Sequence, residues 1–274
     1  MDYYWAQYID NMYFIYLPFS FLLGLAVGSF LNCIIYRLLQ KEAFWRRRSY
    51  CPNCGHKLRA LDLIPLFGFI FLKGRCQYCQ KKISWQYPLV ELVTAVLFIL
   101  VYLKNPIFYP EINLQTAVIQ FIFLIRNWFF VSVLLFIFIF DLKYYLIPDK
   151  IILPAIIITL ILNILLIYRD LLYSIDNFKI LINFFIAVLI GGGFFLIQFL
   201  ISRGRWVGGG DIRLGVLMGL ILGYPTILLA LFLSYLVGAI IGTGLVITGR
   251  KRWKSQVPLG PFLAGATIVV LLYQ

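Results

Sequence analysis

Long, nearly uninterrupted runs of apolar residues dominate the chain. Most runs reach the roughly 20 residues that an α-helix needs to cross the hydrocarbon core of a bilayer. Strand-like alternation of apolar and polar residues does not recur between them. The pattern therefore predicts an all-α polytopic membrane protein with about eight transmembrane helices, at residues 13–36, 86–104, 114–140, 150–168, 178–202, 211–222, 225–248 and 257–273.

The sixth of these segments, residues 211–222, is short for a membrane span. It begins after three consecutive glycines and ends just before "GYP". We expect it either to be tilted and buried among neighbouring helices or to belong to a broken-helix region that lines a cavity.

Composition and charge agree with a membrane protein, because 62% of the 274 residues are hydrophobic and only 13% are charged. With the N-terminus outside, 20 of the 24 Lys and Arg residues fall on the cytoplasmic side, 11 of them in residues 37–85. The positive-inside rule favours this orientation. The net charge of +13 is then explained by topology and anionic lipid, and no nucleic-acid partner is expected. The first apolar run is interpreted as a membrane span and not as a cleavable signal peptide, because no basic residue precedes it.

The chain has one sizeable extramembrane segment, which predicts three parts: a first span (residues 1–36), a cytoplasmic insertion (37–85) and a transmembrane core (86–274). The insertion contains "CPNCGHKL" and "CQYCQ", so a Cys-x2-Cys pair is repeated after 21 residues. Two such pairs supply the four thiolates of a structural zinc ribbon, with Cys51, Cys54, Cys76 and Cys79 as the ligands. The alternatives are thiols without a metal, or disulfides if the topology is inverted.

Two aspartates at the edges of predicted spans are the leading candidates for chemistry. Asp141 ends an aromatic run, Asp211 follows "GGG", and the topology puts both at the cytoplasmic side on different helices. Two facing carboxyl groups cannot both ionise easily, so one keeps a proton while the other stays charged, as water activation requires. The alternatives are helix capping, pairing with Lys143 or Arg213, or a proton or ion relay.

Two other carboxylates lie near the predicted spans. Asp149 follows Pro148, which is typical of a helix start, so Asp149 is expected in the first turn of a helix. Glu91 follows Pro88 by three residues and has a similar interpretation, with a position facing the active site or the cysteine insertion as the alternative.

Glycines recur at spacings that predict close helix packing. The run 208–210 differs because it directly precedes Asp211, where a permissive backbone could orient the carboxylate and leave room for a substrate strand. The glycines that predict packing are Gly24 with Gly28, Gly238 with Gly242, and Gly191 to Gly193, which interrupt the fifth span.

Several of these segments together resemble one family. "GGGDIRLG" is similar to the glycine-x-glycine-aspartate signature of intramembrane aspartyl proteases, and "FDLKYYLIPD" resembles the first-aspartate segment of bacterial type IV prepilin peptidases. "GLAVGSFLNCIIYRL", the four-cysteine insertion and "PLGPFLAGA" resemble further parts of that family in the same order. One departure is Arg213, where the family usually has Lys.

The resemblance implies an enzyme that cuts the short basic leader from prepilins and pseudopilins at the cytoplasmic face of the membrane, with Asp141 and Asp211 as its catalytic pair. It also implies N-methylation of the new N-terminus with S-adenosylmethionine, for which Gly74 and Glu91 are the first guesses at a site. A transporter that uses the aspartates as a proton relay, and a membrane adaptor that binds a partner through its zinc knuckles, are the rival hypotheses. Nothing in the sequence bears on oligomeric state.

Overall fold

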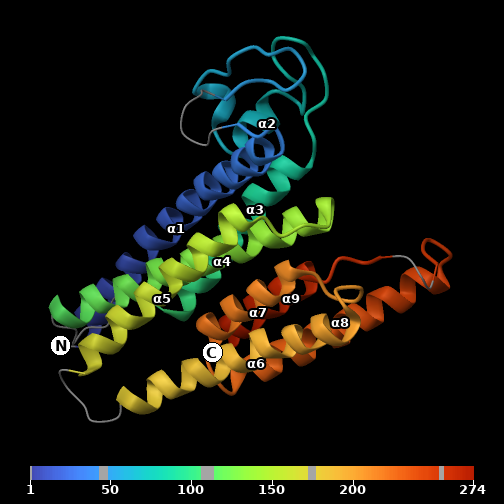
Figure 1. The fold of residues 1–274 in the computed structure, drawn as a ribbon. Helices are drawn as coiled ribbons and strands as arrows, with labels where there is room; N and C mark the ends of the chain where they lie inside the picture. Colours follow the sequence, from blue (N-terminus) through green and yellow to red (C-terminus); the bar gives the residue numbers. More distant parts are fainter. Residues whose placement is uncertain (1, 43–48, 106–113, 172–176, 253–255) are drawn as a thin grey trace. The chain divides into compact units, whose positions relative to one another are not determined.

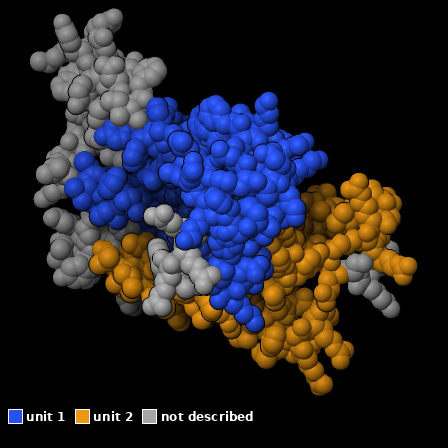
Figure 2. Space-filling model, turned by 90° about the horizontal axis from the view of Figure 1, so that it is seen from above, with its two compact units in different colours: residues 1–132 blue, residues 133–274 orange. Residues whose placement is uncertain are grey.

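A computed structural model describes residues 2–42, 49–105, 114–171, 177–252 and 256–274 (Figure 1). These segments are mainly helical, and they hold no β-strand, only two isolated β-bridges. The chain divides into two compact units, residues 1–132 and 133–274 (Figure 2). The all-α class expected from the apolar pattern is therefore confirmed.

The first unit consists of helices α1 (Asp2–Leu39) and α3 (Gln86–Lys104) and the first part of α4 (Leu114–Tyr144). Between α1 and α3 the chain forms the insertion, with a short 3-10 helix η1 (Leu61–Leu63) and helix α2 (Phe67–Phe71). Figure 1 shows this insertion at the ends of α1 and α3. The insertion is therefore held by both helices.

Glycines allow α1 and α3 to pack closely. A Cβ at Gly24 would lie 2.5 Å from the Cα of Ala95, and a Cβ at Gly28 would lie 2.7 Å from the Cα of Glu91. Atoms do not approach that closely, so only glycine permits this helix separation. The packing role predicted for these two glycines is confirmed.

The second unit contains the end of α4 and five further helices. Helix α7 is short and central to this unit, because most residues from Leu214 to Leu222 are buried. It packs on α6, where a Cβ at Gly219 would lie 2.6 Å from the carbonyl oxygen of Ala187. The five helices are α5 (Asp149–Leu171), α6 (Asn177–Ser202), α7 (Gly209–Leu222), α8 (Thr226–Ile247) and α9 (Gly260–Tyr273).

Each of the eight predicted segments corresponds to a helix, but not every helix is long and apolar enough to cross a membrane. Among the described residues, five meet that criterion, within α1, α3, α4, α6 and α8. Helices α7 and α9 have 14 residues each. The burial expected for the sixth segment is thus observed, while the number of eight spans stays a prediction, as do the predicted domain boundaries.

Two expectations about glycines need correction. Helix α6 runs without interruption through Gly193, and a Cβ added there would have no atom within 4 Å. A Cβ added at Gly242 on α8 would likewise have no atom within 4 Å. Among the described residues, these two glycines therefore do not mediate close helix packing, unlike Gly191 and Gly192, which precede Gly193 on α6.

Candidate active site and metal centre

Asp141 lies one turn before the C-terminal end of α4, and only 6% of it is exposed. Its Oδ2 accepts a hydrogen bond of 3.0 Å from the backbone N–H of Gly260, the first residue of α9. A Cβ at position 260 would lie 2.6 Å from that oxygen, so a larger residue would push the carboxylate away. A backbone donor and a residue without a side chain thus position Asp141.

Gly260 is a site residue that the sequence interpretation did not assign. The segment "PLGPFLAGA" was singled out only through its resemblance to a last span. A local signal existed, because the dipeptide Gly-Pro is typical of a turn that leads into the first residues of a helix. The partner of that position lies 119 residues earlier in the chain, and no local pattern identifies it.

Asp211 is the third residue of α7, and it is partly exposed. Its Oδ2 accepts a hydrogen bond of 3.0 Å from the backbone N–H of Gly208. This is the capping contact considered as an alternative, and the helix N-terminus favours a negative charge there. The contact occupies one carboxylate oxygen, and it holds the side chain at the start of α7.

The glycines before Asp211 do not adopt the backbone that was expected of them. Gly208 has φ −85° and ψ 161°, an extended conformation that any residue adopts, and Gly209 and Gly210 lie in the helix without positive φ values. Gly210 is needed for packing instead, since a Cβ there would lie 2.9 Å from the Cβ of Ile147. Gly209 faces open space, with no atom within 4 Å of an added Cβ.

Asp141 and Asp211 belong to the same unit, and the charge of Asp211 acts on Asp141. The sequence interpretation proposed that these two carboxyl groups face each other, and their pairing as a catalytic dyad stays a prediction. Each is fixed by one backbone N–H from a glycine. A pair of this kind can share one proton, because both groups do not ionise easily at close range.

An ion pair joins the helix that carries Asp211 to the segment that follows Asp141. Arg213 on α7 donates through Nη1 to Oδ1 of Asp149, the first residue of α5. The helix start predicted at Asp149 is confirmed, whereas its pairing with Arg213 was not predicted. Together with the contact of Ile147 on Gly210, this pair fixes the turn between α4 and α5 against the start of α7.

The four cysteines of the insertion form one cluster, and their Sγ atoms all lie within 4.8 Å of one another. The Sγ atoms of Cys51 and Cys79 are 3.9 Å apart, and none of the four forms a disulfide. Four thiolates around a tetrahedral Zn²⁺ at about 2.3 Å would have similar separations. The residues therefore fit a metal ion, as the spacing predicted.

The two cysteine pairs have the same backbone geometry. In the first, the N–H of Cys51 donates to the carbonyl of His56, and the N–H of Gly55 donates to the carbonyl of Cys51. In the second, Cys76 and Gln80 repeat both hydrogen bonds. Local hydrogen bonds thus hold the backbone of each pair in the same turn.

The electrostatics of the cluster favour a thiolate at Cys51. Burial acts to raise its pKa, but hydrogen bonds from the backbone N–H groups of Asn53 and Cys54 and from neighbouring thiols lower the pKa to about 7. His56, the only histidine of the chain, stacks on Tyr78 with 3.6 Å between ring centroids. This contact agrees with a structural position in the first pair.

Glu91 connects α3 to the insertion. The side chain is 7% exposed, and its Oε2 accepts a hydrogen bond of 2.7 Å from the backbone N–H of Leu66. Leu66 has a φ of 61°, an uncommon conformation for a residue with a branched side chain. Of the alternatives left open for Glu91, a position facing the insertion is the one observed.

Comparisons with known proteins agree with the resemblance. Residues 22–105 match the bacterial peptidase A24 N-terminal domain, and residues 128–243 match the type IV leader peptidase family. The prepilin leader peptidase/N-methyltransferase of Aeromonas salmonicida (strain A449) is 33% identical over 94% of this chain and 91% of its own length. The protein of the same name from Bacillus subtilis (strain 168) is 33% identical over 94% of each chain. No solved structure gives a significant match. The chain belongs to the type IV leader peptidase family.

Proposed function

We propose that this protein is a prepilin leader peptidase that uses Asp141 and Asp211 to cleave the leader of prepilins and pseudopilins, and that it also methylates the new N-terminus. The observation that supports the catalytic pair is that both carboxyl groups lie in one unit, that each is held by a backbone N–H, and that the charge of Asp211 acts on Asp141. The relatives named for both activities cover more than 90% of this chain.

Peptide hydrolysis by this pair depends on one proton that the two aspartates share. One carboxylate accepts a proton from a water molecule while the protonated carboxyl group of the other aspartate donates its proton to the scissile carbonyl oxygen. The water oxygen bonds to the carbonyl carbon, and the C–N bond then breaks as the leaving amine takes the proton that the first aspartate had accepted from water. One hydroxyl group of the tetrahedral species returns its proton to the other aspartate, which leaves the new carboxyl group. The hydrogen bonds from Gly208 and Gly260 orient the two carboxyl groups for these transfers.

The metal that we propose for the four cysteines is zinc. Cys51, Cys54, Cys76 and Cys79 would hold it, and a closed site of four thiolates has a structural role. When bound, the metal would cross-link the two cysteine pairs and so add to the stability of the small insertion.

For methylation we propose S-adenosylmethionine as the donor. Gly74 and Glu91 are the first positions to test. Gly74 has a φ of 67°, and a Cβ there would lie 3.0 Å from the ring of Phe69, so the insertion requires glycine at this position. No residue of the chain is assigned to the donor itself.

The protein is a multi-pass protein of the bacterial inner membrane, and membrane lipid is its environment. We propose that the N-terminus lies outside, and that the insertion and the aspartates face the cytoplasm, because the basic residues concentrate on that side. The alternative of a proton-relay transporter receives no support from the family matches or from the names of the relatives.

Leader removal tests the proposal directly. The chain is expressed in membranes with a prepilin, and cleavage is followed as a shift in electrophoretic mobility. Asp141→Asn and Asp211→Asn keep the side-chain shape but remove the ability to accept a proton, so each should reduce the rate by at least about 10²–10⁴-fold with expression intact. Normal cleavage by either variant would contradict the pairing.

A further inference from the structure

The insertion exposes large apolar side chains, although it lies outside the predicted spans. Helix α2 has the sequence FGFIF, and Phe67, Ile70 and Phe71 are exposed, Phe71 to 78%. Residues three and four apart lie on the same side of a helix, so these three form one apolar face of α2. Gly68, between them in sequence, is buried instead, and a Cβ there would lie 2.8 Å from the carbonyl oxygen of Asp62. The apolar face is therefore not the side on which α2 packs against η1.

Two contacts fix α2 beside the first turns of α3. The N–H of Leu66, directly before α2, donates to Oε2 of Glu91 at 2.7 Å. The ring of Phe69 lies 5.0 Å from the ring of Trp85, centroid to centroid, and Trp85 directly precedes α3. Glu91 is the sixth residue of α3, so it lies about 8 Å along the helix from its first residue. Helix α2 therefore lies at the level where α3 begins (Figure 1).

Helix α3 is long and apolar enough to cross a membrane, and its first turns are apolar on their exposed side. Leu89, Leu92 and Val93 are exposed there, as lipid-facing residues of a span are. Trp85 is 76% exposed, and tryptophan concentrates at the boundary between hydrocarbon and headgroups. The contact of Phe69 with Trp85 thus places α2 at that boundary, next to a surface that lipid already covers.

The insertion is also strongly basic. Residues 49–85 contain six Lys and Arg residues and one acidic residue, Asp62. All six basic residues are exposed, and two of them, Lys73 and Arg75, follow α2 within four residues. Exposed apolar side chains combined with Lys and Arg are typical of segments that lie in the membrane interface, because the cations attract anionic headgroups. The six residues are Lys57, Arg59, Lys73, Arg75, Lys81 and Lys82.

We propose that α2 is an interfacial anchor, which inserts Phe67, Ile70 and Phe71 into the leaflet on its own side of the membrane and binds anionic phospholipid. The basis is the position of α2 beside the lipid-facing start of α3, together with its exposed apolar face and the surrounding basic sequence. Such an anchor holds the four-cysteine insertion against the membrane surface. The proposal does not depend on the reaction that the two aspartates catalyse.

Photo-crosslinking identifies what the apolar face touches. The photoreactive residue p-benzoylphenylalanine replaces Phe71 in the full chain, which is reconstituted in liposomes of phosphatidylcholine and phosphatidylglycerol and irradiated. The same residue in place of Asn53 is the matched control, because Asn53 is exposed in the same insertion but lies outside η1 and α2. Replacement of Ile70 gives a second position if the first variant does not accumulate.

We expect the mass of the protein to rise by one phospholipid after irradiation with the probe at position 71 or 70, and not with the probe at position 53. Phosphatidylglycerol should be attached in excess of its share of the liposome, because the insertion is basic. Attachment of both lipids in proportion to their amounts would overturn the anionic partner. The anchor itself would be overturned if positions 71 and 53 gave equal lipid attachment, or if position 71 crosslinked only to protein, whether to the second unit, to another copy of the chain or to a prepilin.

Discussion

The four-cysteine cluster and the aspartate pair are assembled in different ways. All four cysteines come from one segment, residues 51–79, and local hydrogen bonds hold the backbone turn of each Cys-x2-Cys pair. Asp141 and Asp211 lie on α4 and α7, and the donor to Asp141 comes from α9. A local site depends on its own segment and a dispersed site depends on helix packing, so substitutions should affect the two differently.

The largest expected effect is on the metal. Cys51→Ser removes one of the four thiolates that would hold the metal. Structural Zn²⁺ binds zinc-finger peptides with an apparent free energy of roughly 10–16 kcal/mol, which depends on the full set of ligands, so the variant should lose its metal. Metal content of the purified protein, measured by mass spectrometry, should fall from one ion per chain to nearly none. Methylation should fall with it, while leader cleavage persists.

Cys33→Ser is the matched control, because Cys33 lies on α1 outside the cluster. It should retain the metal and both activities. The separation of the two sites would be refuted if Cys51→Ser selectively lost leader cleavage while the insertion remained folded, as judged by its resistance to protease.

The second-largest effect is expected on leader cleavage, at the site around Asp141 and Asp211. Gly260→Ala would put a Cβ 2.6 Å from Oδ2 of Asp141, and a shift of about 1 Å in a reacting group costs about 10²-fold in rate. Cleavage should fall by about that factor, with the metal content unchanged. Single-turnover cleavage in membranes measures it.

Gly209→Ala is the control for Gly260→Ala, since Gly209 is part of the triplet before Asp211 but has no atom within 4 Å of an added Cβ. Its activity should stay within about twofold of wild type. A large loss in Gly209→Ala, or none in Gly260→Ala, would mean that the packing around Asp141 does not limit the reaction.

A smaller effect is expected from the ion pair between α5 and α7. The side chains of Arg213 and Asp149 are 40% and 54% exposed, so their pair is worth about 0.2–1 kcal/mol. Arg213→Met or Asp149→Asn should therefore lower kcat by up to about fivefold. The exchange of both residues, Asp149→Arg with Arg213→Asp, should restore most of the rate. If the double variant is as slow as the single ones, Arg213 has a role other than this pair.

The smallest effect on leader cleavage is expected where the insertion meets α3. Glu91→Leu leaves the N–H of Leu66 without its acceptor, a cost of about 1–3 kcal/mol, whereas Glu91→Gln keeps an acceptor oxygen. Protease sensitivity of the insertion should rise in the first variant and change little in the second, with leader cleavage unaffected in both. Equal sensitivity of the two variants would show that this hydrogen bond does not hold the insertion.

Much of the fold could be predicted from local patterns. The apolar runs located the helices, because a helix in lipid satisfies its own backbone hydrogen bonds and needs only length and hydrophobicity. The glycines of α1 could be assigned to packing from their spacing, but Gly193 and Gly242 look the same in sequence and have no packing partner among the residues that the structure describes. Spacing shows which residue is small, and not whether another helix lies beside it.

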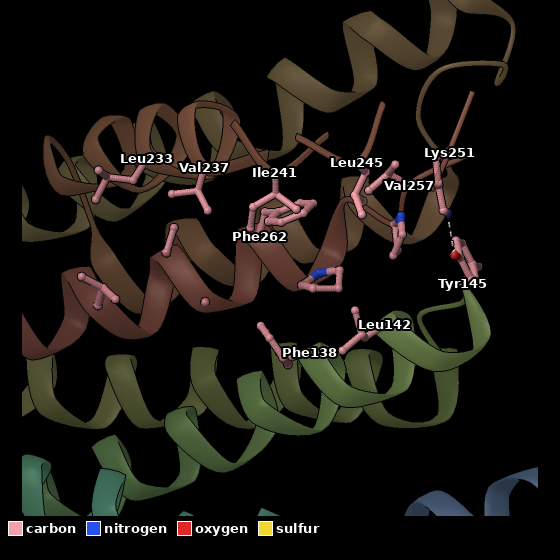
Figure 3. Close-up of a pocket in the computed structure, with 15 residues that line it drawn as sticks. Phe138, Leu142, Tyr145, Leu233, Val237, Ile241, Leu245, Lys251, Val257 and Phe262 are labelled. Atoms are coloured by element: carbon pink, nitrogen blue, oxygen red, sulfur yellow. Dashed lines mark hydrogen bonds between the residues drawn. The ribbon is translucent and has the colours of Figure 1, made fainter. Parts of the chain in front are cut away.

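The sequence by itself determined the helical class, and it singled out the four clustered cysteines and the two aspartates as candidates, since these depend on short-range spacing and on residues that are costly in lipid. Only the tertiary structure decided that Gly260 holds Asp141, that Arg213 pairs with Asp149, and that an apolar pocket forms between α4, α8 and α9 (Figure 3). These features join residues far apart in the chain. Their energies arise from contacts that exist only after the helices have packed, and no local pattern encodes which helices become neighbours.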